Sequence, residues 1–367
     1  MPAPLGPFGP SAALLLGLLR AAGPDGISRM ELAERAGLTP QAVSKITARL
    51  RAAGLAAEAG RRASTGGKPA TVLRLVPGAG HAVGLHLDRD ELTAVLLDLA
   101  GERVAVRRAP LDLGAGAEPV LAAARAEVAA LLAGCPGGRP GGRPAGLLGA
   151  GVAMPGPLDH RAGRPGRVTG FPEWDGFPLR EELARRLGMP VVLDKDTNAA
   201  ALGLALRPGA PDSFAYLHLG TGLGAGLVLG GAVLRGGRTG AGELGHQTVQ
   251  LDGPRCECGG RGCLEVLCLA ALARGDLDGA ARVLGTGAAN LVRLLDMDRV
   301  LLGGRAVLAA PGAFARGARE VLAELGLTAE VAVTDAPDTV AEGAAHLLLA
   351  PVFGAEPSGF PPQPVGK

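Results

Sequence analysis

Residues 242–265 read GELGHQTVQLDGPRCECGGRGCLE and contain four side chains of types that bind zinc in proteins. These candidate ligands are His246, Cys256, Cys258 and Cys263. Three thiolates and one imidazole complete the tetrahedral shell of a structural zinc ion, and the intervening glycines allow a short loop to surround it. The alternative is a group of buried thiols near an unrelated histidine. The close spacing of the cysteines favours a metal site with zinc as its cofactor.

Two carboxylates flank the candidate metal ligands. Glu243 lies three residues before His246, and Glu265 lies two residues after Cys263. A bound zinc ion would hold both carboxylates in one rigid segment. Carboxylates and an imidazole in fixed positions suit the hydroxyl groups of a sugar, which need several well-placed acceptors. Taken alone, each glutamate is better explained as a surface charge near a turn or a helix end.

The composition indicates a protein of several domains without a membrane-spanning segment. The chain has 367 residues, enough for two or three domains, and only 2% of them are aromatic. Long apolar runs are interrupted by charge, glycine or proline, so we expect neither a secretory leader nor a membrane partner. The five cysteines are more typical of metal binding in a reducing compartment than of disulfides. We therefore expect a cytoplasmic protein.

Charge is distributed unevenly along the chain. Residues 1–78 contain ten lysines and arginines and four acidic residues, which gives a balance of +6. The whole chain carries +2, so the remaining residues sum to −4. A small basic module ahead of a mildly acidic body indicates an anionic partner for the first module.

The basic module has the pattern of a winged helix-turn-helix. An apolar helix is expected at 12–22. The second helix, 29–36, begins with a capping box at Ser28 and ends at a C-cap glycine. The third helix, 40–53, follows a threonine cap and a proline, and a hairpin wing is expected at 56–75. Two helices joined by a short glycine-containing turn form a helix-turn-helix.

Several polar and basic residues point away from the predicted core of this module. Those on the third helix suit base edges and phosphates in a major groove, and those in the wing suit the DNA backbone or the minor groove. The predicted DNA contacts are Gln41, Ser44, Lys45 and Arg49 on the helix and Arg61, Arg62 and Lys68 in the wing. The alternative is a three-helix bundle with a solvated basic face. The agreement of fold, caps and charge favours operator DNA as the partner.

Beyond the basic module, predicted strands and helices alternate, as is typical of an α/β body. The expected elements are a hairpin at 83–99, strands at 147–153, 191–193, 214–219 and 300–304, and helices at 117–132 and 179–187. Asp196 follows one of these strands at its carboxyl end, where α/β sheets bind ligands. The glycine-rich run 220–226 suits either a phosphate-binding loop or a tight hairpin turn.

Together these motifs resemble the ROK family (repressors, open reading frames, sugar kinases), and the winged helix ahead of them resembles that of its NagC/XylR-type transcriptional regulators. The matching motifs are GELGH at 242–246, CECGGRGCLE at 256–265, TGGKPA at 65–70 and MPGP at 154–157. The resemblance extends over about residues 10–350. It implies a two-lobed, actin-like body of the sugar kinase/Hsp70-type ATPase fold, assembled into homodimers or homotetramers.

The resemblance also implies roles for particular residues. Asp196 corresponds to the catalytic base that takes a proton from the sugar hydroxyl in the family's kinases, and is vestigial if this chain is a regulator. Glu243, His246 and Glu265 correspond to sugar contacts, with His246 also a zinc ligand. The run 220–226 corresponds to the second phosphate loop, and residues 303–304 correspond to the adenosine loop.

Two departures from the family pattern separate a regulator from a kinase. ROK kinases carry an Asp-x-Gly-Gly-Thr phosphate loop, whereas residues 86–90 read HLDRD. Side chains at Asp88 and Arg89 would block the close approach of phosphate, and Asp88 would repel it. Lys195 stands where the family has an asparagine, and it would either hold Asp196 ionised or bind a charged sugar.

We therefore predict a non-enzymatic, DNA-binding regulator of carbohydrate metabolism, a repressor with a sugar or sugar-phosphate effector. The predicted domains are a winged helix at 1–78, a zinc-bearing ROK domain at 79–351 and a flexible tail at 352–367. One alternative is a sugar kinase that phosphorylates a hexose with ATP and carries an added DNA-binding module. Another is a regulator that responds to a protein partner, which Lys195 and the short stretch between Glu265 and Val300 favour.

Overall fold

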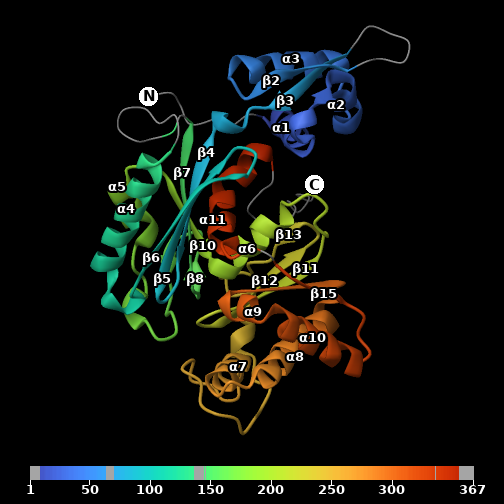
Figure 1. The fold of residues 1–367 in the computed structure, drawn as a ribbon. Coiled ribbons are helices and arrows are strands. Elements are labelled where there is room, and N and C mark those ends of the chain that lie inside the picture. The colour runs from blue at the N-terminus through green and yellow to red at the C-terminus, as the bar shows by residue number, and fades with distance from the viewer. Residues whose placement is uncertain (1–8, 63–69, 136–143, 145, 335, 355–367) are drawn as a thin grey trace, which may run out of the picture.

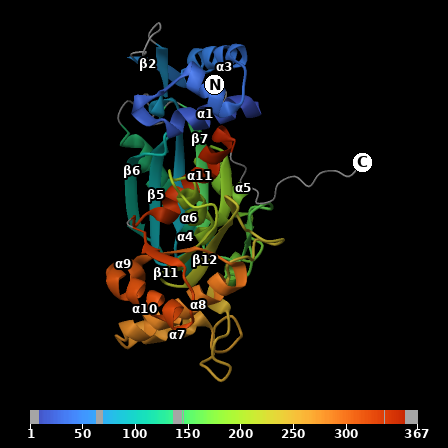
Figure 2. The ribbon, with the colours of Figure 1, turned by 90° about the vertical axis from the view of Figure 1, so that its right-hand side faces the viewer.

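The computed structural model describes residues 9–62, 70–135, 144, 146–334 and 336–354. Three parts follow one another along this chain: a winged helix, a first lobe and a second lobe (Figure 1). Seen from the side, they form an elongated molecule with the winged helix at one end and the second lobe at the other (Figure 2).

The winged helix packs three helices against a small sheet. Its helices are α1 (Pro10–Ala21), α2 (Arg29–Ala36) and α3 (Pro40–Ala52), and its strands are β1 (Ile27–Ser28), β2 (Ala56–Arg62) and β3 (Ala70–Leu75). The strands pair in the order β1-β3-β2. Leu32, Val43 and Leu50 are fully buried in the core that the three helices share. The predicted winged helix-turn-helix is therefore confirmed.

Local capping interactions define the ends of α2 and α3. The Ser28 hydroxyl accepts a hydrogen bond from the Glu31 amide (3.2 Å), and the Glu31 carboxylate accepts one from the Ser28 amide (2.8 Å). Gly37 ends α2 with a φ of 64°, a conformation that glycine adopts without steric cost. The Thr39 hydroxyl accepts a hydrogen bond from the Ala42 amide (3.2 Å) and so caps α3. The predicted capping box and caps are present.

The first lobe is a five-stranded sheet with two helices on its outer face (Figure 1). Its elements are β4 (His81–Leu87), β5 (Glu91–Asp98), β6 (Arg103–Pro110), α4 (Ala117–Ala133), β7 (Leu147–Met154), α5 (Leu179–Leu187) and β10 (Val191–Lys195). The strand order is β10-β7-β4-β5-β6, in which β10, β7 and β4 run parallel and β5 and β6 are antiparallel additions. A short hairpin of β8 (Leu158–Asp159) and β9 (Arg164–Pro165) lies between β7 and α5 in the chain.

The second lobe is built on a similar plan. Its elements are β11 (Phe214–Leu219), β12 (Leu223–Leu229), β13 (Ala232–Val233), α7 (Leu264–Ala273), α8 (Leu277–Leu295), β14 (Arg299–Gly303), α9 (Arg305–Ala309), α10 (Pro311–Glu324) and β15 (Glu330–Val333). The strand order is β13-β12-β11-β14-β15. One apolar core joins α7, α8 and α10 to this sheet. The two sheets confirm the predicted α/β body.

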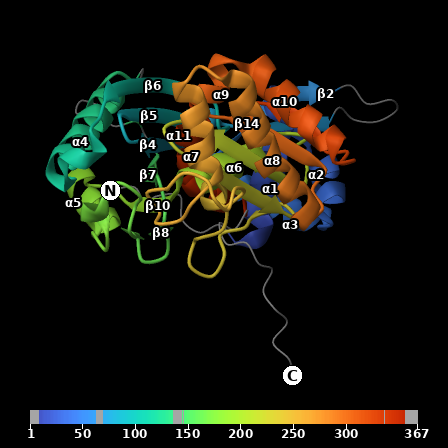
Figure 3. The same cartoon turned by 90° about the horizontal axis from the view of Figure 1, so that it is seen from below.

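Two helices cross from one lobe to the other. The helix α6 (Asp196–Ala205) follows β10 of the first lobe but packs against β12 of the second, and α11 (Thr339–Leu349) follows β15 but packs against β4 and β7 of the first. Figure 3 shows both helices between the two sheets. Glycines allow this approach, because a Cβ atom at Gly84 or Gly151 would collide with carbonyl oxygens of α11. The lobes therefore share a tightly packed pair of helices at their junction.

The run 220–226 forms a hairpin, which is one of the two structures expected for it: residues 220–222 make the turn between β11 and β12, and Gly224 and Gly226 lie within β12. A Cβ atom at Gly226 would collide with the Thr197 carbonyl of α6, which explains this glycine by packing. Residues 352 and 353 belong to a 3-10 helix (Ala350–Phe353) that packs against α1, so they are not part of a flexible tail. Residues 355–367 of that predicted tail lie outside the described residues.

Candidate functional site

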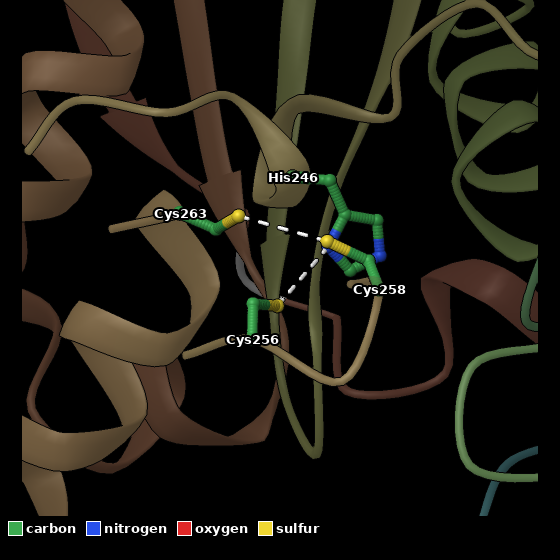
Figure 4. Close-up of side chains that lie close together, drawn as sticks. All are labelled: His246, Cys256, Cys258 and Cys263. Carbon is green, nitrogen blue, oxygen red and sulfur yellow. Dashed lines mark hydrogen bonds between the residues drawn. The ribbon is translucent and has the colours of Figure 1, made fainter. Parts of the chain in front are cut away.

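The four predicted metal ligands converge at one point of the second lobe (Figure 4). One ligand atom from each of His246, Cys256, Cys258 and Cys263 lies within 4.8 Å of the others. The Cys258 and Cys263 sulfurs are 3.7 Å apart, as are the Cys256 sulfur and the His246 Nδ1. Two thiolates at tetrahedral angles around zinc, each at about 2.3 Å, are separated by about 3.8 Å. The donor types and their spacing therefore fit a metal ion.

The backbone around these ligands forms a compact knot. Bridges between Arg255 and Arg261 and between Thr248 and Cys263 bring its ends together. Gly259 and Gly262 have φ values of 94° and 56°, which glycine alone adopts without strain. This is the loop that the glycine-rich spacing of the cysteines predicts. Cys263 occupies the N-cap position of α7, so the metal site and that helix share a residue.

A pocket between the lobes brings the predicted sugar contacts together. Asp196, Glu243, His246 and Glu265 all line it. The Glu265 carboxylate accepts a hydrogen bond from the Leu223 amide at the start of β12 (2.8 Å). The pocket has a free volume of about 60 Å³, room for a few water molecules. A sugar therefore needs the lobes to separate or a side chain in the pocket to move.

Lys195 fills part of this pocket. Its ammonium group is almost fully buried and donates hydrogen bonds to the Ala241 carbonyl (2.6 Å) and to the Glu243 carboxylate (3.0 Å). The expectation that Lys195 holds Asp196 ionised is wrong. Burial raises the pKa of Asp196 to about 7, although the charge of Lys195 and a hydrogen bond from the Thr197 amide act in the opposite direction. Lys195 therefore forms its ion pair with Glu243.

We expect an Asp196→Asn variant to become more stable than the wild type as the pH rises. The folded-state pKa of Asp196 is raised to about 7 from an ordinary 3.8, so the folded protein keeps a proton that the unfolded chain releases. Ionisation of Asp196 therefore costs folded-state stability as the pH rises toward and beyond 7. Urea unfolding should show the variant's advantage growing by about 2–3 kcal/mol between pH 5 and pH 8. An advantage that is equal at both pH values would contradict an Asp196 that holds its proton near neutral pH.

Asp88 and Arg89 line one end of the pocket. The Asp88 carboxylate accepts hydrogen bonds from the Arg89 amide (2.8 Å) and from the Thr221 hydroxyl of the second lobe (2.9 Å). Arg305 at the start of α9 lies 3.5 Å from Asp88 and 2.5 Å from Asp90. Burial alone would raise the pKa of Asp88, but interaction with His86 and these hydrogen bonds outweigh it and lower the pKa. An ionised carboxylate therefore ties the two lobes together here.

A buried ion pair between Arg235 and Asp194 lies beneath the pocket, and the sequence did not predict it. Arg235 donates to the Asp194 carboxylate (2.7 Å), and both side chains are almost inaccessible. Asp194 also accepts hydrogen bonds from the Lys195 amide (2.8 Å) and the Asn198 side chain (3.1 Å). These bonds fix the strand end that carries Lys195 and Asp196. The partners are far apart in sequence, so no local pattern indicates the pair.

The predicted DNA contacts of α3 share one exposed face. Gln41, Ser44, Lys45 and Arg49 are all exposed, whereas Val43 and Leu50 are buried on the opposite face. Neither Lys45 nor Arg49 makes an ion pair with another described residue, so both charges face solvent. The backbone of Arg61 and Arg62 lies in β2, but their side chains and the whole of Lys68 lie outside the described residues. Their part in DNA binding stays a prediction.

The fold and the pocket define a class of protein: a two-lobed body of the sugar-kinase type behind a winged helix of the DNA-binding type. In the described part of the chain, every helix is too short or too polar to cross a membrane. The model of the ROK family matches residues 140–274, and the model of the MarR family matches residues 8–63.

Individual proteins extend this likeness. A ROK hexokinase from Thermus thermophilus is 31% identical with a TM-score of 0.57, over 72% of this chain and 96% of the hexokinase. The putative xylose repressor of Caldicellulosiruptor sp. (strain Rt8B.4) is 31% identical over 241 residues, which cover 65% of this chain and 59% of the repressor. The chain thus matches about three fifths of that repressor's length. A ROK family transcriptional regulator, a homologue of the E. coli MLC protein, shares the fold at a TM-score of 0.74 and 22% identity, over 95% of this chain and 98% of that regulator.

This chain belongs to the ROK family, and it carries a MarR-type winged helix ahead of the ROK body. The resemblance inferred from the GELGH and CECGGRGCLE motifs is confirmed, as is the predicted fold.

Proposed function

We propose that the protein is a DNA-binding transcriptional regulator, a repressor, whose ROK body binds a sugar or sugar derivative as its effector. The observation that carries the proposal is the exposed polar and basic face of α3 on the same chain as an acidic pocket of the sugar-kinase type. A relative named as a putative xylose repressor, matched over 65% of this chain, supports it. The protein acts as a homodimer or homotetramer, which presents two winged helices to a two-fold operator.

The phosphate end of the pocket argues against the kinase alternative. Catalysis of phosphoryl transfer depends on backbone amides and cations that surround the phosphates. Here the carboxylate of Asp88 occupies that end and is held by Thr221 and Arg305. An anion would have to displace these side chains and approach a negative charge. One observation favours the kinase: a pKa of about 7 for Asp196 suits a general base.

Effector and operator would be coupled through α11. This helix packs against α6 at the junction of the lobes, and its C-terminal end shares an apolar core with α1 of the winged helix. An effector in the pocket contacts groups from both lobes and favours one arrangement of them. Because α11 touches both lobes and the winged helix, that arrangement changes the placement of the DNA-binding face. The coupling is reciprocal, so operator binding changes effector affinity by the same factor.

We further propose that the His246, Cys256, Cys258 and Cys263 cluster holds one zinc ion with a structural role. Four protein ligands leave no open position for a substrate, as in other structural zinc sites. The ion would position His246 itself and, through Cys263 and α7, the carboxylate of Glu265. When bound, zinc supplies rigidity to the sugar end of the pocket.

A thermal-shift screen of neutral sugars and sugar phosphates tests the effector proposal. A ligand present at one hundred times its Kd stabilises a folded protein by about 2.7 kcal/mol, so a specific sugar should raise Tm by several degrees. We expect Glu243→Gln to abolish the shift and Glu34→Gln, an exposed carboxylate on α2, to leave it intact.

The same sugar, incubated with magnesium and ATP, should give no ADP above background. Sugar-dependent turnover that disappears in Asp196→Asn would replace the regulator proposal with the kinase alternative. A shift that survives Glu243→Gln would place the effector elsewhere.

A further inference from the structure

A second cavity lies where the winged helix meets the first lobe and the two helices that cross between the lobes. It has a volume of about 870 Å³, within the range of about 300–1,000 Å³ that is typical of small-molecule sites. Its walls come from α1 and β3 of the winged helix, the turn between β5 and β6 of the first lobe, the C-terminal end of α6, and α11. None of its lining residues belongs to the sugar pocket between the lobes.

The cavity combines apolar walls with an excess of positive charge. Leu19, Leu75, Pro77, Leu206 and Phe353 are among the apolar residues of its wall. The charged lining residues are four arginines (Arg20, Arg74, Arg103 and Arg207) and two glutamates (Glu102 and Glu342), a balance of +2. Such a lining suits a ligand with an apolar body and a negative charge.

The arginines differ in how far their charge is already compensated. Arg103 lies 2.6 Å from the carboxylate of Asp338, and Arg103 and Arg207 lie 3.5 Å and 3.8 Å from that of Glu342. Arg20 lines the cavity, donates its Nε–H to the Ala100 carbonyl (2.9 Å) and places its guanidinium over the Phe353 ring, 5.0 Å from the centroid. The side chain of Arg74 makes no hydrogen bond or ion pair with another described residue. Its charge is therefore available to an anion.

His346 is a neutral, almost fully buried side chain of the cavity wall. Its side chain lines the cavity, is only 7% exposed, and has no hydrogen-bond partner for Nδ1 among the described residues. A buried polar nitrogen without a partner costs free energy, and such atoms are uncommon in folded proteins. Burial, reinforced by Arg20 and Arg207, lowers the pKa of His346 to about 3, so the ring is neutral and able to donate or accept one bond.

We propose that this cavity is a second ligand site, for a small anion with an apolar body, bound by Arg74 and Arg20. A molecule there touches the winged helix, the first lobe and the two helices that cross between the lobes, and it would bias the position of the DNA-binding face independently of the sugar pocket. The test of this site measures only the binding of a ligand to the cavity. A negative result would therefore leave the proposed sugar-responsive regulator unaffected.

The test uses two dyes of similar shape and different charge, titrated into the full-length protein. The anion 8-anilino-1-naphthalenesulfonate should bind one site per chain with a rise in fluorescence, and the uncharged N-phenyl-1-naphthylamine should bind at least about tenfold more weakly. In Arg74→Gln the anion should lose about tenfold in affinity while the uncharged dye is unaffected. Arg125→Gln, an exposed arginine on α4 outside the cavity, is the matched control and should bind both dyes as the wild type does.

A bulky substitution in the cavity wall distinguishes dye that binds in the cavity from dye that binds to other apolar surfaces. Ala21 lines the cavity at the end of α1 and is exposed, so Ala21→Trp fills space there without disturbing a core. This variant should lose the anion's binding while keeping the wild-type Tm. Unchanged binding in a folded Ala21→Trp variant, or equal affinities of wild type and Arg74→Gln for the anion, would overturn the proposal. If Ala21→Trp does not fold, the Arg74→Gln comparison decides alone.

Discussion

A Lys45→Glu, Arg49→Glu double variant will bind duplex DNA at least about one hundredfold more weakly than the wild type at low salt. Both side chains lie on the exposed face of α3 and make no ion pair with another described residue. Each positive charge on that face releases condensed counterions when it meets a phosphate, and a glutamate there repels the phosphate instead. The weaker binding therefore has both an entropic and a direct electrostatic cause.

Fluorescence anisotropy with a labelled duplex, repeated at several salt concentrations, measures this effect. The salt dependence of the wild type should be steeper, by about one unit of log–log slope for each DNA phosphate that the variant no longer neutralises. The matched control is Arg125→Glu, Arg167→Glu, which makes the same change of net charge on exposed positions of the body. If both double variants bound DNA equally weakly, net charge alone would explain DNA binding and α3 would not be the contact.

A Cys263→Ser variant will lose its metal and much of its stability. We expect about one zinc per chain in the wild type and almost none in the variant, because a four-ligand site that loses a buried thiolate no longer closes around the ion. Cys263 is 1% exposed and also occupies the N-cap position of α7. Serine is itself a good helix cap, so the substitution removes the metal ligand and spares the start of the helix. The variant should also lose its thermal shift with sugar, because Glu265 sits in the first turn of α7.

Elemental analysis and urea unfolding of two other cysteine variants complete this experiment. Cys268→Ser changes a fully buried thiol whose Sγ lies 3.6 Å from the Ala280 carbonyl, so it should lower stability but keep the zinc. Cys135→Ser should change neither. Zinc retained by Cys263→Ser at the wild-type level would show that the cluster is not the metal site.

Features that depend on neighbours in the chain were predictable from the sequence. The Ser28 capping box, the Gly37 C-cap and the Thr39 cap each act within four residues, and each defines a helix end as expected. The metal cluster was also predictable from the sequence, because its ligands lie within eighteen residues of one another and glycines allow the turn. Such local signals can be recognised in the sequence without knowledge of the tertiary fold.

Interactions between distant segments were not predictable in the same way. Lys195 was expected to act on its neighbour Asp196, but β10 points its ammonium group at Glu243, which lies 48 residues away. Arg305 reaches Asp90 across 215 residues of chain, and no periodicity relates the two. The glycines of β12 suited either a phosphate loop or a hairpin turn, and the sequence could not decide between them because it does not show that α6 lies against the strand. Burial and lobe packing, rather than local pattern, set these features.

Selection of DNA from a random-sequence library by the full-length protein tests the central claim most directly. The account predicts that repeated rounds enrich one sequence with approximate two-fold symmetry and half-sites one or two helical turns apart, and that the Lys45→Glu, Arg49→Glu variant enriches nothing. The sugar that raises Tm should change the affinity for that sequence. Wild-type protein that enriches no sequence, or an enriched sequence that the double variant binds equally well, would contradict the account.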